Sequence, residues 1–402
     1  MNRVLFISGS LGLGHIQRDL VIAGELRKLV PDVEIQWIAA DPATKMIQEA
    51  GEKLHPKYDL YANDTAAAER ASSGSQLNLL KYLNNASKEW ETNVTLVDQI
   101  TRDENFDVIV GDETYEIAVG FSKRPEMKRA PFVMIYDFVG MDSMSANPLE
   151  WLGVYIWNRL WSEDLRKGTE PSFDEGIFIG EEEDVEDRPF GFLLPGRREW
   201  AKSRCKFVGY ILPFDPRDYR SDTGVSGGQD EKREPLIVCA IGGTAIGKEL
   251  LILCGDAFGF IKERAPAARM VLVCGPRLKK EGLAVPAGVE VREYVPNLFE
   301  LFAKCDVAIV QGGGTTTLEL TALQKPFVYF PLERHFEQAQ VARRLERHRA
   351  GVRRSYSETP PEELAEDVLR LLDAQTNYAE IPLQGGARAA ELIAAQMQGT
   401  KR

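Results

Sequence analysis

Short apolar segments alternate with longer amphipathic ones along the chain, and this alternation predicts an α/β fold. Residues 4–7, 34–39, 106–110 and 132–136 are largely apolar, as expected for strands buried on both faces of a parallel sheet. Between the first two strands, apolar residues recur at the three- and four-residue spacing of a helix: Ile16, Leu20, Ala23 and Leu26. The chain therefore opens on a βαβ unit.

The same alternation restarts in the second half of the chain. Strands are predicted at residues 236–241, 270–274, 289–294, 307–310 and 327–330. Residues 213–235, just before them, are rich in proline, glycine, serine and charge, which is typical of a linker. We expect two Rossmann-like parallel-sheet domains facing across a cleft. The predicted parts are an N-terminal domain (1–213), a linker (214–234), a C-terminal domain (235–385) and a last helix (386–402) that could pack back on the N-terminal domain.

Composition narrows the class of protein. The 402 residues are 44% hydrophobic and 27% charged, as in ordinary globular proteins, and the net charge of −12 argues against binding nucleic acid through a generally basic surface. The five cysteines form no CxxC pair and the four histidines are scattered, so we expect no metal site. Without a signal-peptide pattern or an apolar run of about 18 residues, we expect a cytoplasmic protein.

Titratable side chains follow three of the predicted strands in the N-terminal half. His15 comes after the first strand, Asp112 after the third and Asp137 after the fourth. Because the carboxyl ends of parallel strands share one edge of a sheet, we expect these groups to form an acid/base site. At a helix N-terminus the cationic form of His15 is disfavoured, so its ring should be able to accept a proton. A capping role for His15 is the alternative.

A run of three glycines follows the strand at 307–310. Gln311 precedes Gly312, Gly313 and Gly314, and a helix is predicted to begin near Thr315. Glycines let backbone N–H groups approach a ligand closely, and a helix N-terminus favours a phosphate. This stretch therefore predicts phosphate binding, although a buried strand with a glycine turn would read similarly.

Two other stretches leave alternatives open. The glycines at 9, 12 and 14 do not follow the GxGxxG order of dinucleotide folds, but Asp41 after the second strand keeps nicotinamide binding as a minor alternative. The helix predicted at 148–165 carries i,i+4 aromatic pairs, Trp151 with Tyr155 and Trp157 with Trp161. It would pack on the core, line an apolar acceptor groove, or contact a membrane surface through Trp157 and Trp161.

Five motifs in order resemble the GT-B fold nucleotide-sugar glycosyltransferases, close to the bacterial group that includes the UDP-N-acetylglucosamine transferase of lipid II synthesis. The resemblance covers most of both halves and is weakest between about 141 and 205. The motifs are Gly9 to His15, Gly242-Gly243-Thr244, Glu293 to Pro296 followed by Cys305 to Val307, Gly312 to Glu319, and Pro331 to Gln338.

The resemblance implies a role for each motif. A UDP-sugar would be the donor cosubstrate, without a metal or other cofactor, and His15, Asp112 or Asp137 would deprotonate a small-molecule or lipid-linked hydroxyl acceptor. The residues implied to bind the diphosphate are Gly243, Thr244, Gly313, Gly314 and Thr315. The residues implied to bind the base and ribose are Tyr294, Val295 and Glu319, and those implied to bind the sugar are His335, Glu337 and Gln338. Related enzymes invert the sugar carbon by single displacement, so the same outcome is expected.

The chain departs from this family at Gln311, where many relatives carry histidine. Glutamine adds no charge beside the diphosphate, so either binding is weaker or His335 substitutes. Three further functions therefore stay open: a UDP-sugar hydrolase, a 2-epimerase on the same fold, and an inactive nucleotide-binding protein. Peripheral membrane contact through the aromatic helix is a fourth.

Overall fold

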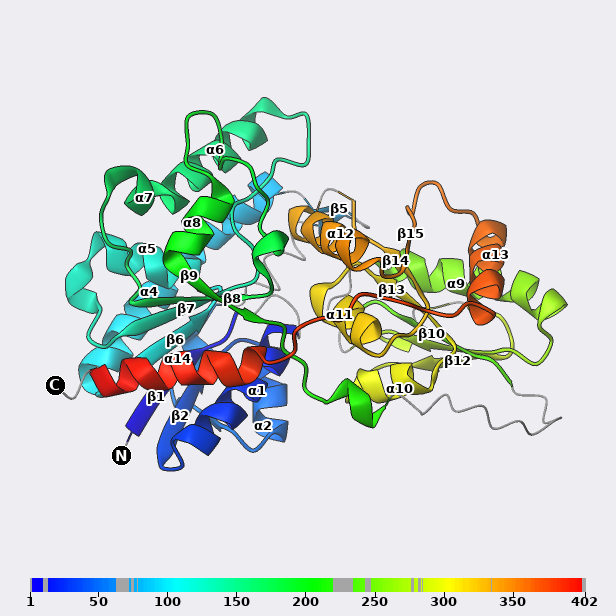
Figure 1. Cartoon of the computed structure of the whole chain (residues 1–402), viewed down its shortest axis with the longest axis horizontal. Helices are drawn as coiled ribbons and strands as arrows, with labels where there is room; N and C mark the ends of the chain where they lie inside the picture. Colours follow the sequence, from blue (N-terminus) through cyan, green and yellow to red (C-terminus); the bar gives the residue numbers. More distant parts are fainter. Residues whose placement is uncertain are drawn as a thin grey trace. The chain divides into compact units, whose positions relative to one another are not determined.

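The chain folds into two compact units. The N-terminal unit contains Met1–Ala71, Asn78–Pro213 and Pro382–Arg402, and the C-terminal unit contains Ser72–Leu77 and Phe214–Ile381. The computed structural model (Figure 1) describes residues 2–9, 14–62, 72–73, 76–77, 79–219, 234–242, 247–275, 278–280, 283, 285–333 and 335–399, with backbone alone within 72–89. The short strands β4 (Ser72–Ser73) and β5 (Gln76–Leu77) pair with each other.

A seven-stranded parallel sheet forms the centre of the N-terminal unit, in the order β3-β2-β1-β6-β7-β8-β9. Its strands are β1 (Asn2–Ile7), β2 (Val33–Ile38), β3 (Lys53–Leu54), β6 (Val108–Asp112), β7 (Phe132–Tyr136), β8 (Glu175–Ile179) and β9 (Cys205–Gly209). The predicted strands are confirmed. Strands β8 and β9 were not predicted, because Glu175 and Gly176 interrupt one apolar run and Lys206 the other.

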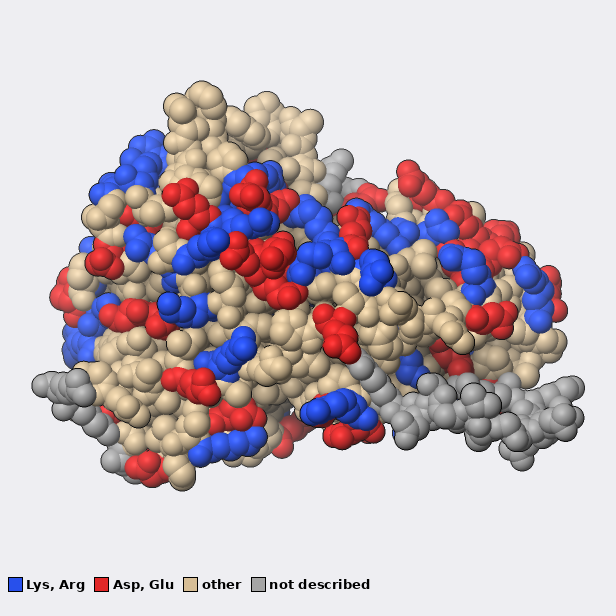
Figure 2. Space-filling view, in the orientation of Figure 1, with Lys and Arg blue, Asp and Glu red and all other residues tan. Residues whose placement is uncertain are grey.

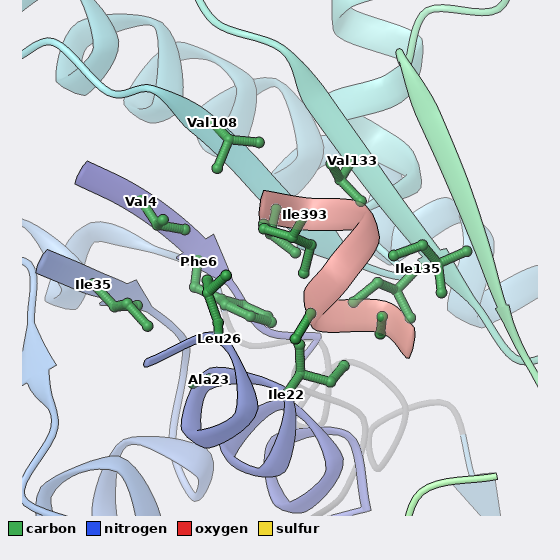
Figure 3. Close-up of a cluster of buried hydrophobic side chains, with 14 of the residues drawn as sticks. Val4, Phe6, Ile22, Ala23, Leu26, Ile35, Val108, Val133, Ile135 and Ile393 are labelled. Carbon is green, nitrogen blue, oxygen red and sulfur yellow. The ribbon is translucent and has the colours of Figure 1, made fainter. Parts of the chain in front are cut away.

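Helices cover this sheet (Figure 1): α1 (Gly14–Leu29), α2 (Ala43–Glu49), α4 (Leu79–Asp103), α5 (Tyr115–Lys123), α6 (Pro148–Trp161), α7 (Glu163–Lys167), α8 (Arg197–Arg204) and α14 (Gly385–Gly399). The last of them, α14, packs on α1 and on the sheet, with Ile393 among Phe6, Ile22 and Ile135 (Figure 3). Close approach requires glycine at the start of α14. A Cβ on Gly385 would lie 2.6 Å from the Tyr210 carbonyl oxygen. The chain's last helix thus completes the core of its first domain.

A six-stranded parallel sheet, β12-β11-β10-β13-β14-β15, forms the centre of the C-terminal unit. Its strands are β10 (Leu236–Ala240), β11 (Arg269–Val273), β12 (Val289–Arg292), β13 (Val307–Gln311), β14 (Phe327–Phe330) and β15 (Val352–Arg353). Its helices are α9 (Lys248–Arg264), α10 (Leu298–Lys304), α11 (Gly314–Ala322), α12 (Phe336–His348) and α13 (Pro361–Leu372). All five cysteines of the chain are buried and free. The predicted α/β class with two parallel sheets is confirmed.

The aromatic helix differs from its prediction. α6 ends at Trp161 and, after Ser162, α7 begins, so residues 148–165 do not form one continuous helix. Trp151 stacks on Tyr155 as expected, with ring centroids 6.0 Å apart. Trp157 instead packs edge-on against Trp90, and Trp161 lies among the core aromatics. Trp151, in contrast, is 60% exposed, and contact of this helix with a membrane stays a prediction. Among the described residues, no helix is long and apolar enough to cross a membrane.

The strand order explains where each unit can hold a ligand. In both sheets the order reverses at the first strand, since β1 lies between β2 and β6, and β10 between β11 and β13. Ligands of open α/β sheets bind beyond the carboxyl ends of the strands at such a reversal. His15 and Asp112 follow β1 and β6 at the reversal of the first sheet, and the glycine run follows β13 at the reversal of the second.

Candidate active site

The N-terminal unit brings together the three side chains predicted to form an acid/base site. His15 lies in the first turn of α1, Asp112 ends β6, and Asp137 directly follows β7. The Nδ1 atom of His15 is 3.2 Å from Oδ2 of Asp112. A Cβ on Gly9 would lie 2.8 Å from the Asp112 carbonyl oxygen, so glycine there allows the end of β1 to approach the end of β6.

Sequence reasoning missed Arg18, which joins the three. Its Nε and Nη2 atoms donate to the two carboxylate oxygens of Asp112, at 2.9 and 2.6 Å, and its Nη1 donates to Asp137 at 2.6 Å. Nη2 also lies 2.8 Å from Nδ1 of His15. The spacing in the sequence could have revealed it. Arg18 follows His15 by three residues on the predicted helix, so the two side chains lie on the same helix face.

Arg18 also controls the ionisation of the carboxylates. Although burial opposes it, the charge of Arg18 lowers the pKa of Asp112 to about 2. The pKa of Asp137 is lowered in the same way: burial opposes, and Arg18 and a hydrogen bond shared with Glu113 outweigh it. Both carboxylates are therefore ionised at neutral pH.

Glu113 is a fourth acid in this cluster and was not among the predicted site residues. It adopts a left-handed conformation with φ of 53°, and its Oε2 lies 3.7 Å from Nε2 of His15. Burial and the neighbouring Asp137 raise its pKa well above the usual value. This shift favours the protonated form of Glu113 beside Asp137.

A cation could meet three ligand atoms in this cluster. His15, Glu113 and Asp137 each offer one ligand atom, and these atoms lie within 4.8 Å of one another. Arg18 already donates to Asp137 at 2.6 Å and supplies a positive charge at the same place. The guanidinium of Arg18 thus already supplies a positive charge at the place where a metal ion would bind.

In the C-terminal unit the glycine run lies where β13 ends and α11 begins. Gly313 is the N-cap of α11, and Gly314 and Thr315 form its first turn, so their N–H groups face out of the helix N-terminus. A Cβ on Gly312 would lie 2.9 Å from Cα of Pro331. Glycine at position 312 thus allows the turn between β13 and α11 to approach the loop after β14.

Glu319 lies within α11 and is buried, with only 3% of its surface exposed. Burial raises the pKa of its carboxyl to about 8. No hydrogen-bond partner for this carboxyl is found among the described residues, although a buried polar group left unpaired is costly. Such a carboxyl is suited to a ligand that brings hydroxyl groups.

The loop predicted to hold a sugar is organised around Gln338. The Oε1 atom of Gln338 accepts the Leu332 N–H at 2.7 Å, so its amide hydrogens are what it can offer to a ligand. His335 is the N-cap of α12, its ring accepts the Gln338 N–H, and burial lowers its pKa. Glu337, between them, is half-buried.

The remaining predicted residues are less defined by contacts. Gly243 and Thr244 lie outside the described residues. Tyr294 and Val295 lie between β12 and α10, and Tyr294 is exposed. Gln311, the departure from the family, is buried at the end of β13, and a Cβ on Gly247 would lie 1.5 Å from its Nε2 atom. Gln311 therefore packs against the residue that caps the N-terminus of α9.

Comparison with known proteins finds glycosyltransferases. The glycosyltransferase family 28 C-terminal domain matches residues 237–396. An uncharacterized glycosyltransferase of Methanosarcina mazei is 24% identical over 401 residues, covering 94% of this chain and 93% of the relative. The UDP-N-acetylglucosamine–N-acetylmuramyl-(pentapeptide) pyrophosphoryl-undecaprenol N-acetylglucosamine transferase of Carboxydothermus hydrogenoformans is 28% identical over 199 residues, 48% of this chain and 49% of the relative.

Solved structures show the same fold. The glycotransferase of kitacinnamycin aligns with a TM-score of 0.60 at 15% identity, covering 99% of this chain and 95% of that chain. At this identity the likeness establishes the architecture alone. Together with the family 28 domain and the relatives, it confirms the predicted resemblance.

Proposed function

This chain is a glycosyltransferase of the GT-B type with a family 28 C-terminal domain, and we propose that it moves a sugar from a UDP-linked donor to a hydroxyl acceptor. The observation that carries the donor site is Glu319, a buried carboxyl with no partner among the described residues, one turn beyond a glycine-capped helix N-terminus. Ribose hydroxyls would donate to this carboxylate.

The rest of the donor follows from the same turn. The N–H groups of Gly313, Gly314 and Thr315 would bind the diphosphate, helped by the positive end of the α11 dipole. Gly243 and Thr244 would add to them from the segment before α9, and backbone near Tyr294 and Val295 would meet the uracil. Charge that grows on the departing diphosphate is thereby stabilised without a metal.

The donor sugar would lie against the loop before α12. Gln338 would donate its amide hydrogens to sugar hydroxyl oxygens, because its own oxygen already accepts the Leu332 N–H. Glu337 would accept from sugar hydroxyls, and His335 would border them. The donor sugar we propose is N-acetylglucosamine, because the relative from Carboxydothermus hydrogenoformans, which matches 48% of this chain, is an N-acetylglucosamine transferase.

The acceptor would be activated in the N-terminal unit. His15, held beside Asp112, would take the proton of the acceptor hydroxyl as that oxygen attacks the sugar carbon. The imidazolium that forms is stabilised by the carboxylate of Asp112, which stays ionised because its pKa is about 2. A single displacement of this kind inverts the sugar carbon.

Release of UDP with and without acceptors tests the proposal. We expect UDP release from UDP-N-acetylglucosamine to depend on a hydroxyl acceptor, with the sugar recovered on that acceptor. Free sugar formed at an unchanged rate without acceptor would instead establish the hydrolase. Interconversion of the donor at C2 would establish the epimerase, and UDP binding without turnover would establish the inactive nucleotide-binding protein.

We propose further that the N-terminal unit contacts a membrane surface through α6, the helix that carries Trp151 to Trp161, and through the loop beside it. An apolar patch consists of the outward side chains of α6 and the tip of the neighbouring hairpin: Leu149, Trp151, Leu152, Ile156, Leu160, Phe192 and Leu193. Leu193 is 83% and Phe192 74% exposed, and Leu193 adopts a left-handed conformation with φ of 57°. A leucine at this exposed tip costs free energy twice, because its backbone is strained and its apolar side chain faces solvent.

The patch is built as one surface. Asn158 of α6 donates to the Phe190 carbonyl at 2.8 Å, and Tyr155 donates to the Phe192 carbonyl at 3.2 Å. The one acid of α6, Glu150, is turned inward to Ser143 and Ser145, whereas Arg159 is exposed. Figure 2 shows this end of the unit, where Figure 1 places α6, as a tan surface with Lys and Arg beside it.

A stripe of leucine and isoleucine beside a stacked Trp–Tyr pair, with an exposed arginine and no exposed acid on α6, fits the interface of a phospholipid bilayer. It would bring the enzyme to a lipid-linked acceptor. Vesicles of phosphatidylcholine with phosphatidylglycerol should bind the protein, even at high salt because the contact is apolar. Trp151→Ser with Leu193→Ser should reduce the bound fraction about tenfold or more.

Leu60→Ser is the matched control, since Leu60 is 56% exposed in the same unit but outside the patch, and it should bind vesicles like the wild type. Equal binding by the patch variant would contradict the membrane contact. A wild-type dimer that becomes monomeric in the patch variant would instead assign the patch to a second copy of the chain.

A further inference from the structure

Arg18 constrains which nitrogen of His15 can carry a hydrogen atom. A guanidinium has only donors, so a ring nitrogen 2.8 Å from Nη2 of Arg18 must accept. That nitrogen is Nδ1. The Asp112 oxygen faces the same nitrogen at the longer distance of 3.2 Å, so the shorter contact, with the guanidinium, sets the role of Nδ1.

A neutral imidazole has one N–H group, which must then lie on Nε2. This is the opposite of the tautomer that a proton-accepting His15 needs. Were the hydrogen on Nδ1, Asp112 would accept it and Nε2 would present its lone pair to an acceptor hydroxyl. In the arrangement with Arg18 at Nδ1, the Nε2–H group instead points toward Oε2 of Glu113, 3.7 Å away.

The charges around the ring explain why Arg18 occupies this position. Among the described residues, Arg18, Asp112 and Glu113 lie against the His15 ring, and Asp137 and Asp19 are the further acids beside Arg18. Four acids thus surround one guanidinium. Asp112 already accepts two hydrogen bonds from Arg18 and does not need a third from His15.

We infer that Arg18 is a positioning residue that sets the tautomer of His15 and withholds its basic nitrogen until Arg18 leaves Nδ1. On departure of the guanidinium, Nδ1 takes up a proton from water and donates it to Asp112, while Nε2 releases its proton to solvent. Nε2 can then accept the proton of the acceptor hydroxyl. The catalytic meaning of this inference rests on the proposed function, but the tautomer itself does not.

Nitrogen NMR of protein with ¹⁵N-labelled histidine tests the tautomer without any substrate. The chain has four histidines, so the His15 signals can be assigned by their loss in His15→Gln. At a pH where the ring is neutral, we expect the wild type to carry hydrogen on Nε2 and none on Nδ1. Arg18→Met should move the hydrogen to Nδ1.

Arg27→Met is the matched control. Arg27 lies on the same helix in a two-point ion pair with Glu52, and its loss should leave the His15 tautomer unchanged. A wild-type ring with hydrogen on Nδ1 would overturn the inference, and that spectrum decides the matter even if Arg18→Met fails to fold. Transferase activity, measured as UDP release, would be unaffected by that result, so the two proposals fail separately.

Discussion

At the scale of single residues, the chemistry of the N-terminal unit depends on how one guanidinium divides its donors. Sequence spacing predicted His15, Asp112 and Asp137 at one sheet edge, because parallel strands end on the same side. It could not predict Arg18 or Glu113, since their roles arise from burial and mutual distance. In the C-terminal unit the ribose role of Glu319 stays a prediction, and the burial of its carboxyl, with no partner among the described residues, supports it.

Removing the proposed base should cost rate and not donor binding. His15→Ala is expected to lower kcat by roughly 10²- to 10⁴-fold, the usual contribution of a positioned general base. The donor KM should change little, because the donor residues belong to the other unit. Steady-state kinetics of UDP release measure both constants. An unchanged kcat would move the base to Asp112 or Asp137.

Burial of Glu319 should make stability depend on pH. Its pKa rises from 4.5 to about 8 on folding, so the folded state holds a proton that the unfolded state releases. Stability from this group is therefore present at low pH and is lost as pH rises from about 4.5 through 8, by the order of a few kcal/mol. Urea unfolding of Glu319→Gln should lack this loss. Parallel pH curves for variant and wild type would contradict the assignment.

At the scale of elements, glycine positions decide how closely strands, helices and loops approach. The sequence predicted the core strands well, because fully apolar runs have few other uses, and it missed β8 and β9, whose runs contain Glu175 and Lys206. Glycine runs predicted the turns. Which glycine is indispensable could not be read from the sequence, because it depends on the atom that a Cβ would meet.

Gly247 is such a glycine. It has φ of 95°, and a Cβ there would lie 1.5 Å from Nε2 of Gln311. Gly247→Ala should destabilise the protein by about 1–3 kcal/mol or more and weaken UDP binding, since it caps α9 directly after residues 243–246. Gly259→Ala on the same helix meets nothing within 4 Å and should be neutral or slightly stabilising. Equal melting temperatures for the two variants would refute the packing described.

The helix α14 offers a second test at this scale. Ile393 is fully buried in the N-terminal core, so Ile393→Ala should cost about 2–5 kcal/mol in chemical denaturation. The exposed neighbour Glu391 is the control, and Glu391→Ala should change stability by less than about 0.5 kcal/mol. A harmless Ile393→Ala would mean that α14 does not pack on α1 in solution.

At the scale of the whole molecule, the chain has two parallel sheets with separate cores, and the repeated βα pattern predicted both sheets. The proposed division of roles, an acid/base cluster in one unit and a nucleotide site in the other, stays a prediction from the strand ends and the glycine runs. The acceptor could not be predicted from the sequence. The exposed face of α6 could not be predicted either, because it depends on tertiary packing: Trp157 packs against Trp90, whereas Trp151 and Leu152 are exposed.

The proposed uridine nucleotide site of the C-terminal unit can be tested by thermal shift with UDP, TDP, GDP and ADP. A ligand that binds only the folded state stabilises it by about 2.7 kcal/mol at a hundredfold excess over Kd. We predict that UDP raises the melting temperature more than the other three nucleotides do. An unchanged melting temperature with all four nucleotides would contradict a nucleotide site in the C-terminal unit.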